Sequence, residues 1–173
     1  MKIWVAVGSG AIAFLMTVFA HGQSAQSGGT LRDQLIGTLV LVSNTDKNSD
    51  GTPKWGTDPK GSLIFEANGR YSFMIVRSDL PKFTAKAADK GTPEENASVV
   101  RGSFAIFGTF TVDEQKKTFT TNIEGSIYPN IVGLSMTRTV TAIGTNEFRY
   151  TNATTATGAS ADVLWRRINP AQH

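Results

Sequence analysis

Residues 103–112 read SFAIFGTFTV, and this stretch decides the fold class. Large apolar side chains occupy alternate positions at Phe104, Ile106 and Phe110. A period of two residues is typical of a β-strand that buries one face. Gly108 falls within the run, where a bend or bulge of the kind that barrel closure requires costs little. The sequence therefore predicts a curved, half-buried strand.

The same alternation recurs along the chain between short turn segments. It predicts eight strands, at 36–43, 61–67, 70–77, 103–112, 117–127, 134–143, 147–152 and 161–168. A regular succession of helical crossovers is missing, which disfavours a parallel α/β fold. Eight antiparallel strands can remove their exposed edges by closing into a barrel with room for one small ligand. We therefore predict an all-β, eight-stranded antiparallel up-and-down barrel, with a two-sheet sandwich as the alternative.

Asn68 and Gly69 separate the second and third predicted strands. An Asn-Gly pair between two apolar runs favours a two-residue type I′ turn, which needs positive φ at both positions. In the resulting register Phe65 faces Ser72, so both faces of the hairpin carry large apolar groups. Such a pattern indicates a sheet that curves around an interior and is partly covered outside.

Two helices are predicted from their caps. Thr30 opens a short helix that ends near Leu35, close to the N-terminus. Thr92 and Glu95 form a capping box for a second helix between the third and fourth strands, and Gly102 follows its last turn. This second helix either closes one mouth of the barrel or is a surface connection.

An apolar run over residues 3–20 is followed by a polar sequence at 21–24. This layout is typical of a secretory signal peptide. We therefore expect residues 1–22 to be a signal peptide and residues 23–173 to form one barrel domain. The protein would then be exported, periplasmic or secreted, with no permanent membrane span after cleavage. A run of this length is also near the lower limit for a bilayer-spanning helix, so an uncleaved anchor is the alternative.

The residue types that the chain lacks exclude several kinds of site. There is no cysteine, which excludes disulfides and thiolate chemistry. The two histidines, His21 and His173, lie near the ends of the chain, so we expect no imidazole catalysis, no metal and no cofactor. The formal net charge is +3 with scattered basic residues, which argues against a nucleic-acid partner.

Residues 46–51, DKNSDG, reproduce the beginning of a calcium-binding loop. The glutamate of the twelfth loop position is replaced by Thr57. Asp, Asn and Gly are also the ordinary residues of a solvated turn, which is the interpretation we favour.

Six motifs occur in order at 35–43 (LIGTLVLVS), 58–65 (DPKGSLIF), 68–70 (NGR), 108–113 (GTFTVD), 123–130 (IEGSIYPN) and 163–166 (VLWR). Together they resemble the lipocalin-like domain family of bacterial and fungal proteins over essentially the whole chain after residue 22. The resemblance implies an up-and-down β-barrel but no defined activity. Where that family carries Gly-x-Trp on the first strand, this chain has Leu39, and Trp165 on the last strand could fill the space.

The candidates for contact with a ligand inside the barrel are four aromatic and three polar side chains: Tyr71, Phe73, Phe104, Phe110, Asn122, Glu124 and Arg138. Glu124 and Arg138 are mid-strand charges on consecutive strands. If they face inward, an arginine fork could pair with the carboxylate, and the patch could orient a ligand's head group. The alternative is a structural or exposed ion pair without a ligand.

The sequence thus predicts an exported barrel that binds a small hydrophobic or amphipathic molecule. No catalytic residue is assigned, because no nucleophile elbow, phosphate loop or paired-histidine motif occurs. Two alternatives stay open. One is a cofactor-free isomerase or cyclase that uses a carboxylate in the barrel. The other is a structural envelope protein whose barrel is filled.

Overall fold

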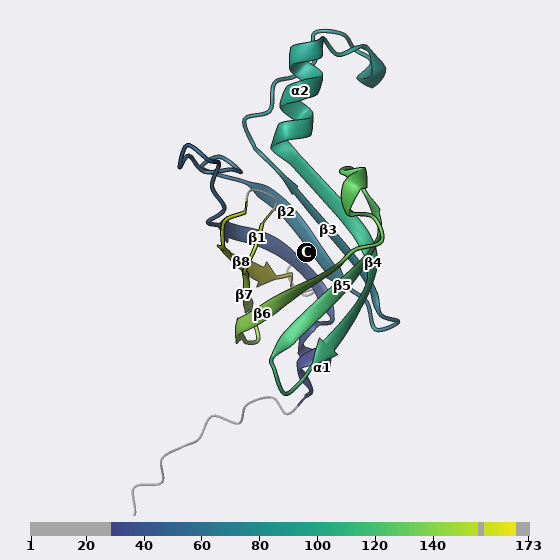
Figure 1. The fold of residues 1–173 in the computed structure, drawn as a ribbon, viewed down its shortest axis with the longest axis vertical. Helices are drawn as coiled ribbons and strands as arrows, with labels where there is room; N and C mark the ends of the chain where they lie inside the picture. The colour runs from purple at the N-terminus through teal and green to yellow at the C-terminus, as the bar shows by residue number, and fades with distance from the viewer. Residues whose placement is uncertain (1–28, 156–157, 169–173) are drawn as a thin grey trace, which may run out of the picture.

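The computed structural model describes residues 29–155 and 158–168, and within them the chain forms one closed barrel of eight strands (Figure 1). Each strand pairs antiparallel with the next, and the last strand pairs with the first. This confirms the up-and-down barrel and rules out the sandwich. The strands are β1 (Gly37–Asn44), β2 (Lys60–Phe65), β3 (Arg70–Val76), β4 (Ser103–Asp113), β5 (Thr118–Ser126), β6 (Ser135–Ile143), β7 (Glu147–Asn152) and β8 (Ala161–Arg167).

The turn between β2 and β3 differs from the predicted two-residue turn. Gly69 has a φ of 89°, whereas Asn68 is not in the positive-φ region. Gly69 N donates to Glu66 O at 2.9 Å, and Glu66 N donates to Arg70 O at 3.0 Å, so three residues form the loop. The Asn68 side chain accepts a hydrogen bond from Arg70 N at 2.8 Å, which holds the turn without a second left-handed residue.

This longer loop changes the register of the hairpin. Phe65 lies opposite Tyr71 and Leu63 lies opposite Phe73, and all four side chains are buried. The prediction that Phe65 faces Ser72 was therefore wrong. Because directly opposed residues share a face, the observed register gathers the large rings on the inner side of the hairpin.

A bulge in the β4–β5 pairing lies at Gly108, where the sequence predicted a bend or bulge, and the extra residue is Glu124 on β5. The register with β5 shifts between Phe107 and Gly108. A Cβ atom at position 108 would lie 2.0 Å from the carbonyl oxygen of Asn122, so only glycine allows this approach of the two backbones.

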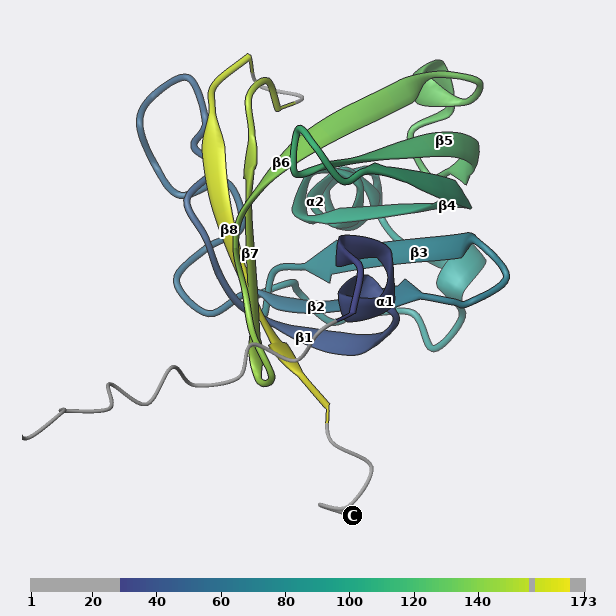
Figure 2. The ribbon, with the colours of Figure 1, turned by 90° about the horizontal axis from the view of Figure 1, so that it is seen from below.

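The helix α1 (Leu31–Leu35) lies at one end of the barrel, seen from below in Figure 2. Its predicted capping box is present, because Thr30 Oγ1 accepts from Asp33 N at 3.1 Å and the Asp33 carboxylate accepts from Thr30 N at 3.1 Å. Glu114, in the β4–β5 turn, accepts hydrogen bonds from two further amides of the helix, at 2.7 and 3.0 Å. Leu35 is fully buried beneath. This end of the barrel is therefore closed.

An aromatic layer fills the barrel next to α1. It consists of Phe65, Tyr71, Phe110, Phe119 and Phe148, with Phe65 at the centre and its ring 4.8–6.2 Å from the other four. Leu39, at the position where the resembled family carries tryptophan, is also fully buried, as is Trp165. The interior of this half is thus occupied by the protein's own side chains.

The connection between β3 and β4 contains η1 (Ala88–Lys90) and α2 (Pro93–Gly102). The predicted capping box of α2 is present, with Glu95 N donating to Thr92 Oγ1 at 3.2 Å. The helix projects beyond the ends of the strands, and Val100 is 72% exposed (Figure 1). It therefore does not close the mouth. A short turn, η2 (Pro129–Ile131), follows β5 at the same end.

No helix within residues 29–155 and 158–168 has the length and apolar character needed to cross a membrane. The expected signal peptide, residues 1–22, lies outside the described residues.

Candidate functional site

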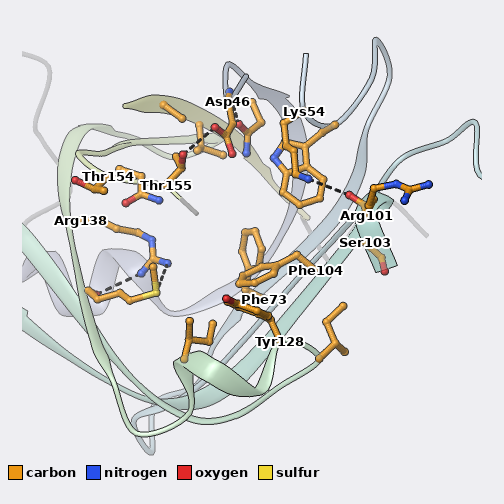
Figure 3. Close-up of a pocket in the computed structure, with 18 of the residues that line it drawn as sticks. Asp46, Lys54, Phe73, Arg101, Ser103, Phe104, Tyr128, Arg138, Thr154 and Thr155 are labelled. Carbon is orange, nitrogen blue, oxygen red and sulfur yellow. Dashed lines mark hydrogen bonds between the residues drawn. The ribbon is translucent and has the colours of Figure 1, made fainter. Parts of the chain in front are cut away.

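A cavity of about 630 Å³ occupies the half of the barrel opposite α1. Its walls come from the inner faces of β3, β4 and β6–β8, and its rim comes from the β1–β2 loop, the end of α2 and the β5–β6 connection. Figure 3 shows Phe73, Phe104, Tyr128 and Arg138 around this space. The aromatic layer lies below it, so the cavity has a closed floor and one open end.

The walls are largely apolar. Phe73 and Phe104, on the inner faces of neighbouring strands, lie with their ring centres 6.1 Å apart. Met136 and Val163 line the cavity from the opposite strands. Trp55, only 8% exposed, reaches the cavity from the β1–β2 loop. Walls of mainly apolar surface that also carry placed polar groups are typical of a site for a small, largely apolar molecule.

Arg138 is the charged group at the floor of the cavity. Its side chain projects inward from β6, and the residue is only 5% exposed. Nη1 donates to Thr121 Oγ1 at 3.0 Å and to the Met136 carbonyl at 3.3 Å. The guanidinium carbon lies 5.7 Å from the ring centre of Phe119 and 5.8 Å from that of Tyr150. The aromatic layer therefore carries a cation on its upper surface.

The charges that line the cavity are predominantly positive. Lys54, Arg101 and Arg138 contribute three cations, and Asp46 contributes one carboxylate. Lys54 Nζ donates to the Arg101 carbonyl at 3.1 Å and lies 5.5 Å from the Trp55 ring centre, which places both cationic residues at the rim. An anionic molecule approaching the mouth would be attracted.

Two buried tyrosines lie close to Arg138. Burial raises the pKa of both the Tyr71 and the Tyr150 hydroxyl, and the positive charge of Arg138 opposes the rise in each case. Both phenols therefore stay neutral at physiological pH. Neither phenol therefore supplies a negative charge to balance Arg138.

Of the seven predicted ligand contacts, Phe73, Phe104 and Arg138 line the cavity. Tyr71 and Phe110 are buried in the aromatic layer below it. Whether a ligand touches them stays a prediction.

Asn122 and Glu124 lie on the outside of the barrel, which corrects the expectation that they share the interior with Arg138. Glu124 forms an ion pair with Arg70 at 2.7 Å, and both side chains are nearly half exposed. The reason is the register of β5 with β6. Arg138 lies opposite Phe119, so Phe119, Thr121 and Ile123 of β5 face inward, whereas Asn122 and Glu124 face solvent.

Two important lining residues were not among the predicted contacts. Tyr150 occupies an inward position of β7, two residues after the buried Phe148, and that alternation was a usable signal. Trp55 lies in a loop of mostly polar residues, where a large aromatic side chain itself indicates burial.

The Asp46–Asp50 segment forms an ordinary polar loop. Asp46 Oδ1 accepts from Thr155 Oγ1 at 2.9 Å and from Lys47 N at 3.0 Å, while Asp50 Oδ1 accepts from Thr52 Oγ1 at 2.6 Å. No group of three or more His, Cys, Asp or Glu side chains suited to a metal ion occurs among the described residues. The carboxylate required by an isomerase or cyclase would have to be Asp46, since Glu124 lies outside.

A comparison with protein families finds one match, to a model described as a lipocalin-like domain, over residues 36–168. The matched range runs from the start of β1 to the end of β8 and so contains the entire barrel. No curated protein matches the chain.

Proposed function

The chain belongs to the lipocalin-like domain family, and on that premise we propose that it is an exported protein that holds one small, largely apolar molecule inside its barrel. The cavity of about 630 Å³ carries the proposal. Sites for small molecules are typically concave, of a few hundred cubic ångströms or more, with apolar walls and a few placed polar groups. The cavity has that size and composition.

The contrast between the two halves of the barrel supports binding over a purely structural role. In the half near α1, five aromatic rings fill the interior. Protein interiors are normally packed as densely as this. In the other half the inner faces of the same strands leave space, and the rim is wide enough to connect it with solvent. A barrel that served only as a scaffold would gain stability by filling that half as well.

Binding can be tested by displacement of N-phenylnaphthylamine, an uncharged apolar dye whose fluorescence rises in apolar surroundings. We expect the purified protein to bind the dye. Lipids from a bacterial extract should then displace the dye from the cavity. Ala161→Trp places a large ring in the cavity, because Ala161 is buried and lines it. Ala142→Trp is the matched control on the exposed face of β6. Loss of dye binding in the first variant alone supports the proposal. Equal binding in both variants contradicts it.

Export is the second part of the proposal, and it is supported by the apolar run at residues 3–20 and the polar change that follows. N-terminal sequencing of the protein recovered from the cell envelope or medium tests it. We expect a start between His21 and Ala25. Recovery of a membrane-embedded product that still begins at Met1 would contradict cleavage.

A further inference from the structure

Arg138 is a buried cation that forms no ion pair within the part of the chain that the structure describes. Its hydrogen bonds from Nη1 go to a hydroxyl and a carbonyl, which carry no net charge. Nε has no hydrogen-bond partner, and the contact of Nη2 is with the Met136 sulfur at 3.9 Å. The Tyr150 hydroxyl also interacts with the guanidinium, but it is neutral and supplies no counter-charge. One edge of the guanidinium, formed by Nε and Nη2, is therefore left without a strong acceptor.

Burial of a charge without a counter-ion is expensive, and arginine does not escape the cost by losing its proton. Cation–π attraction to the ring faces of Phe119 and Tyr150 offsets part of the cost of burying this charge. The remainder stays uncompensated in the protein alone. A purely structural position would be served better by a methionine or leucine of similar volume. The arginine therefore points to an anionic group that arrives from outside the chain.

We propose that the ligand carries a carboxylate at one end and that Arg138 binds this carboxylate at the floor of the cavity. The apolar remainder of the ligand would lie against Phe73 and Phe104 and extend toward the open end. The inference rests on the proposed function, because it names the head group of the molecule that the cavity holds.

The geometry of the free edge favours a carboxylate. Adjacent guanidinium N–H groups match the two oxygens of a carboxylate in a fork of parallel hydrogen bonds. Met136 occupies this edge with a weak sulfur acceptor and a flexible side chain that can move aside. A single buried arginine balances one negative charge, whereas a phosphate would bring a second charge into the same place. At the rim, Lys54 and Arg101 would attract the anion before it enters.

The test compares dodecanoate, dodecanol and dodecylamine, which share one alkyl chain and differ in head group. Each is used below its micelle-forming concentration to displace N-phenylnaphthylamine from the purified wild-type chain. We expect dodecanoate to bind about ten- to hundredfold more tightly than dodecanol, with dodecylamine the weakest. This series needs no substitution, so it does not depend on the folding of a variant.

Three variants test whether Arg138 causes the preference for dodecanoate over dodecanol. Arg138→Met should bring the affinities for dodecanoate and dodecanol to within about twofold of each other. The change should come from weaker binding of dodecanoate, because dodecanol forms no ion pair with Arg138. Arg138→Lys keeps the charge without the fork and should retain part of the ratio. Arg166→Met removes an exposed arginine from the outer side of β8 and should behave as wild type.

The outcomes separate the two proposals. Equal affinity for acid and alcohol in the wild type overturns the carboxylate assignment and leaves small-molecule binding intact. An acid preference that survives in Arg138→Met overturns the role of Arg138. A protein that binds neither the dye nor any of the three amphiphiles overturns both. A role of Arg138 in stability alone would alter the melting temperature of the variant without altering the acid-to-alcohol ratio.

Discussion

Arg138 and Thr121 lie side by side on the inner faces of β6 and β5, and Arg138 Nη1 donates a hydrogen bond of 3.0 Å to Thr121 Oγ1. Thr121 is fully buried and also donates to the Met136 carbonyl at 3.4 Å. The hydroxyl therefore fixes the guanidinium from one side and leaves the opposite edge facing the methionine sulfur. This contact determines how the cation is presented to the cavity.

Removal of that hydroxyl should destabilise the fold. Thr121→Val keeps the shape of the side chain but leaves a buried arginine N–H without its acceptor, which costs about 1–3 kcal/mol. Urea unfolding followed by circular dichroism measures the change. Thr111→Val, at an exposed position of β4, is the matched control and should change the free energy of unfolding by less than about 0.5 kcal/mol. Equal effects of the two substitutions would show that the Thr121 contact is energetically unimportant.

The ion pair between Arg70 and Glu124 should contribute little. Its side chains are 43% and 47% exposed, so water screens the interaction. We expect Arg70→Ala and Glu124→Ala each to cost about 0–1 kcal/mol. A double-mutant cycle of Glu124→Ala with Arg138→Met should give a coupling energy near zero, because the two residues lie on opposite faces of the sheet. A coupling above about 1 kcal/mol would contradict this placement.

Gly108 should be intolerant of any side chain. A Cβ atom there would lie 2.0 Å from the Asn122 carbonyl oxygen, which is backbone and cannot move without breaking the β4–β5 pairing. We expect Gly108→Ala to lower the free energy of unfolding by at least about 3 kcal/mol. Gly144→Ala is the control, because a Cβ atom there meets no atom within 4 Å and its φ is not positive. Similar melting temperatures for the two variants would disprove the close approach.

Alkaline pH should destabilise the protein through Tyr71 and Tyr150. Burial raises the pKa of both hydroxyls above the ordinary tyrosine value of 10.0 in the folded state. Between that value and the higher folded pKa, the unfolded chain loses protons that the folded chain keeps. The neutral phenols therefore make their full contribution to the free energy of unfolding below pH 10. Above pH 10 this contribution declines by up to about 1.4 kcal/mol per pH unit for each tyrosine.

Urea titrations from pH 8 to pH 11 test this decline. A variant with both Tyr71→Phe and Tyr150→Phe should show a shallower fall, while the titration of lysines remains common to both proteins. Parallel pH profiles would indicate that neither phenol resists ionisation in the folded state.

The sequence by itself determined the strands, the two helices and the barrel. The alternation around Phe104 and Phe110, the caps at Thr30 and Thr92, and the glycine at 108 are local signals, and each acts within a few residues of the structure that it specifies. Period-two patterns and caps express the geometry of the backbone itself. For this reason the predicted strand boundaries agree with the observed ones to within one or two residues.

Only the tertiary structure decided which side chains meet in the cavity. The threonine-rich β6 carries no strong pattern of its own, so the inward direction of Arg138 followed from its pairing with Phe119 on β5. A one-residue change in register exchanges the inner and outer faces of a strand, so the observed pairing of Arg138 with Phe119 decided that Glu124 faces solvent. The shape of the cavity likewise depends on how distant loops, among them the one that carries Trp55, are arranged around the strand ends. Packing between segments far apart in the chain sets these relations, even where a local alternation, as at Phe148 and Tyr150, indicates which face of one strand is buried.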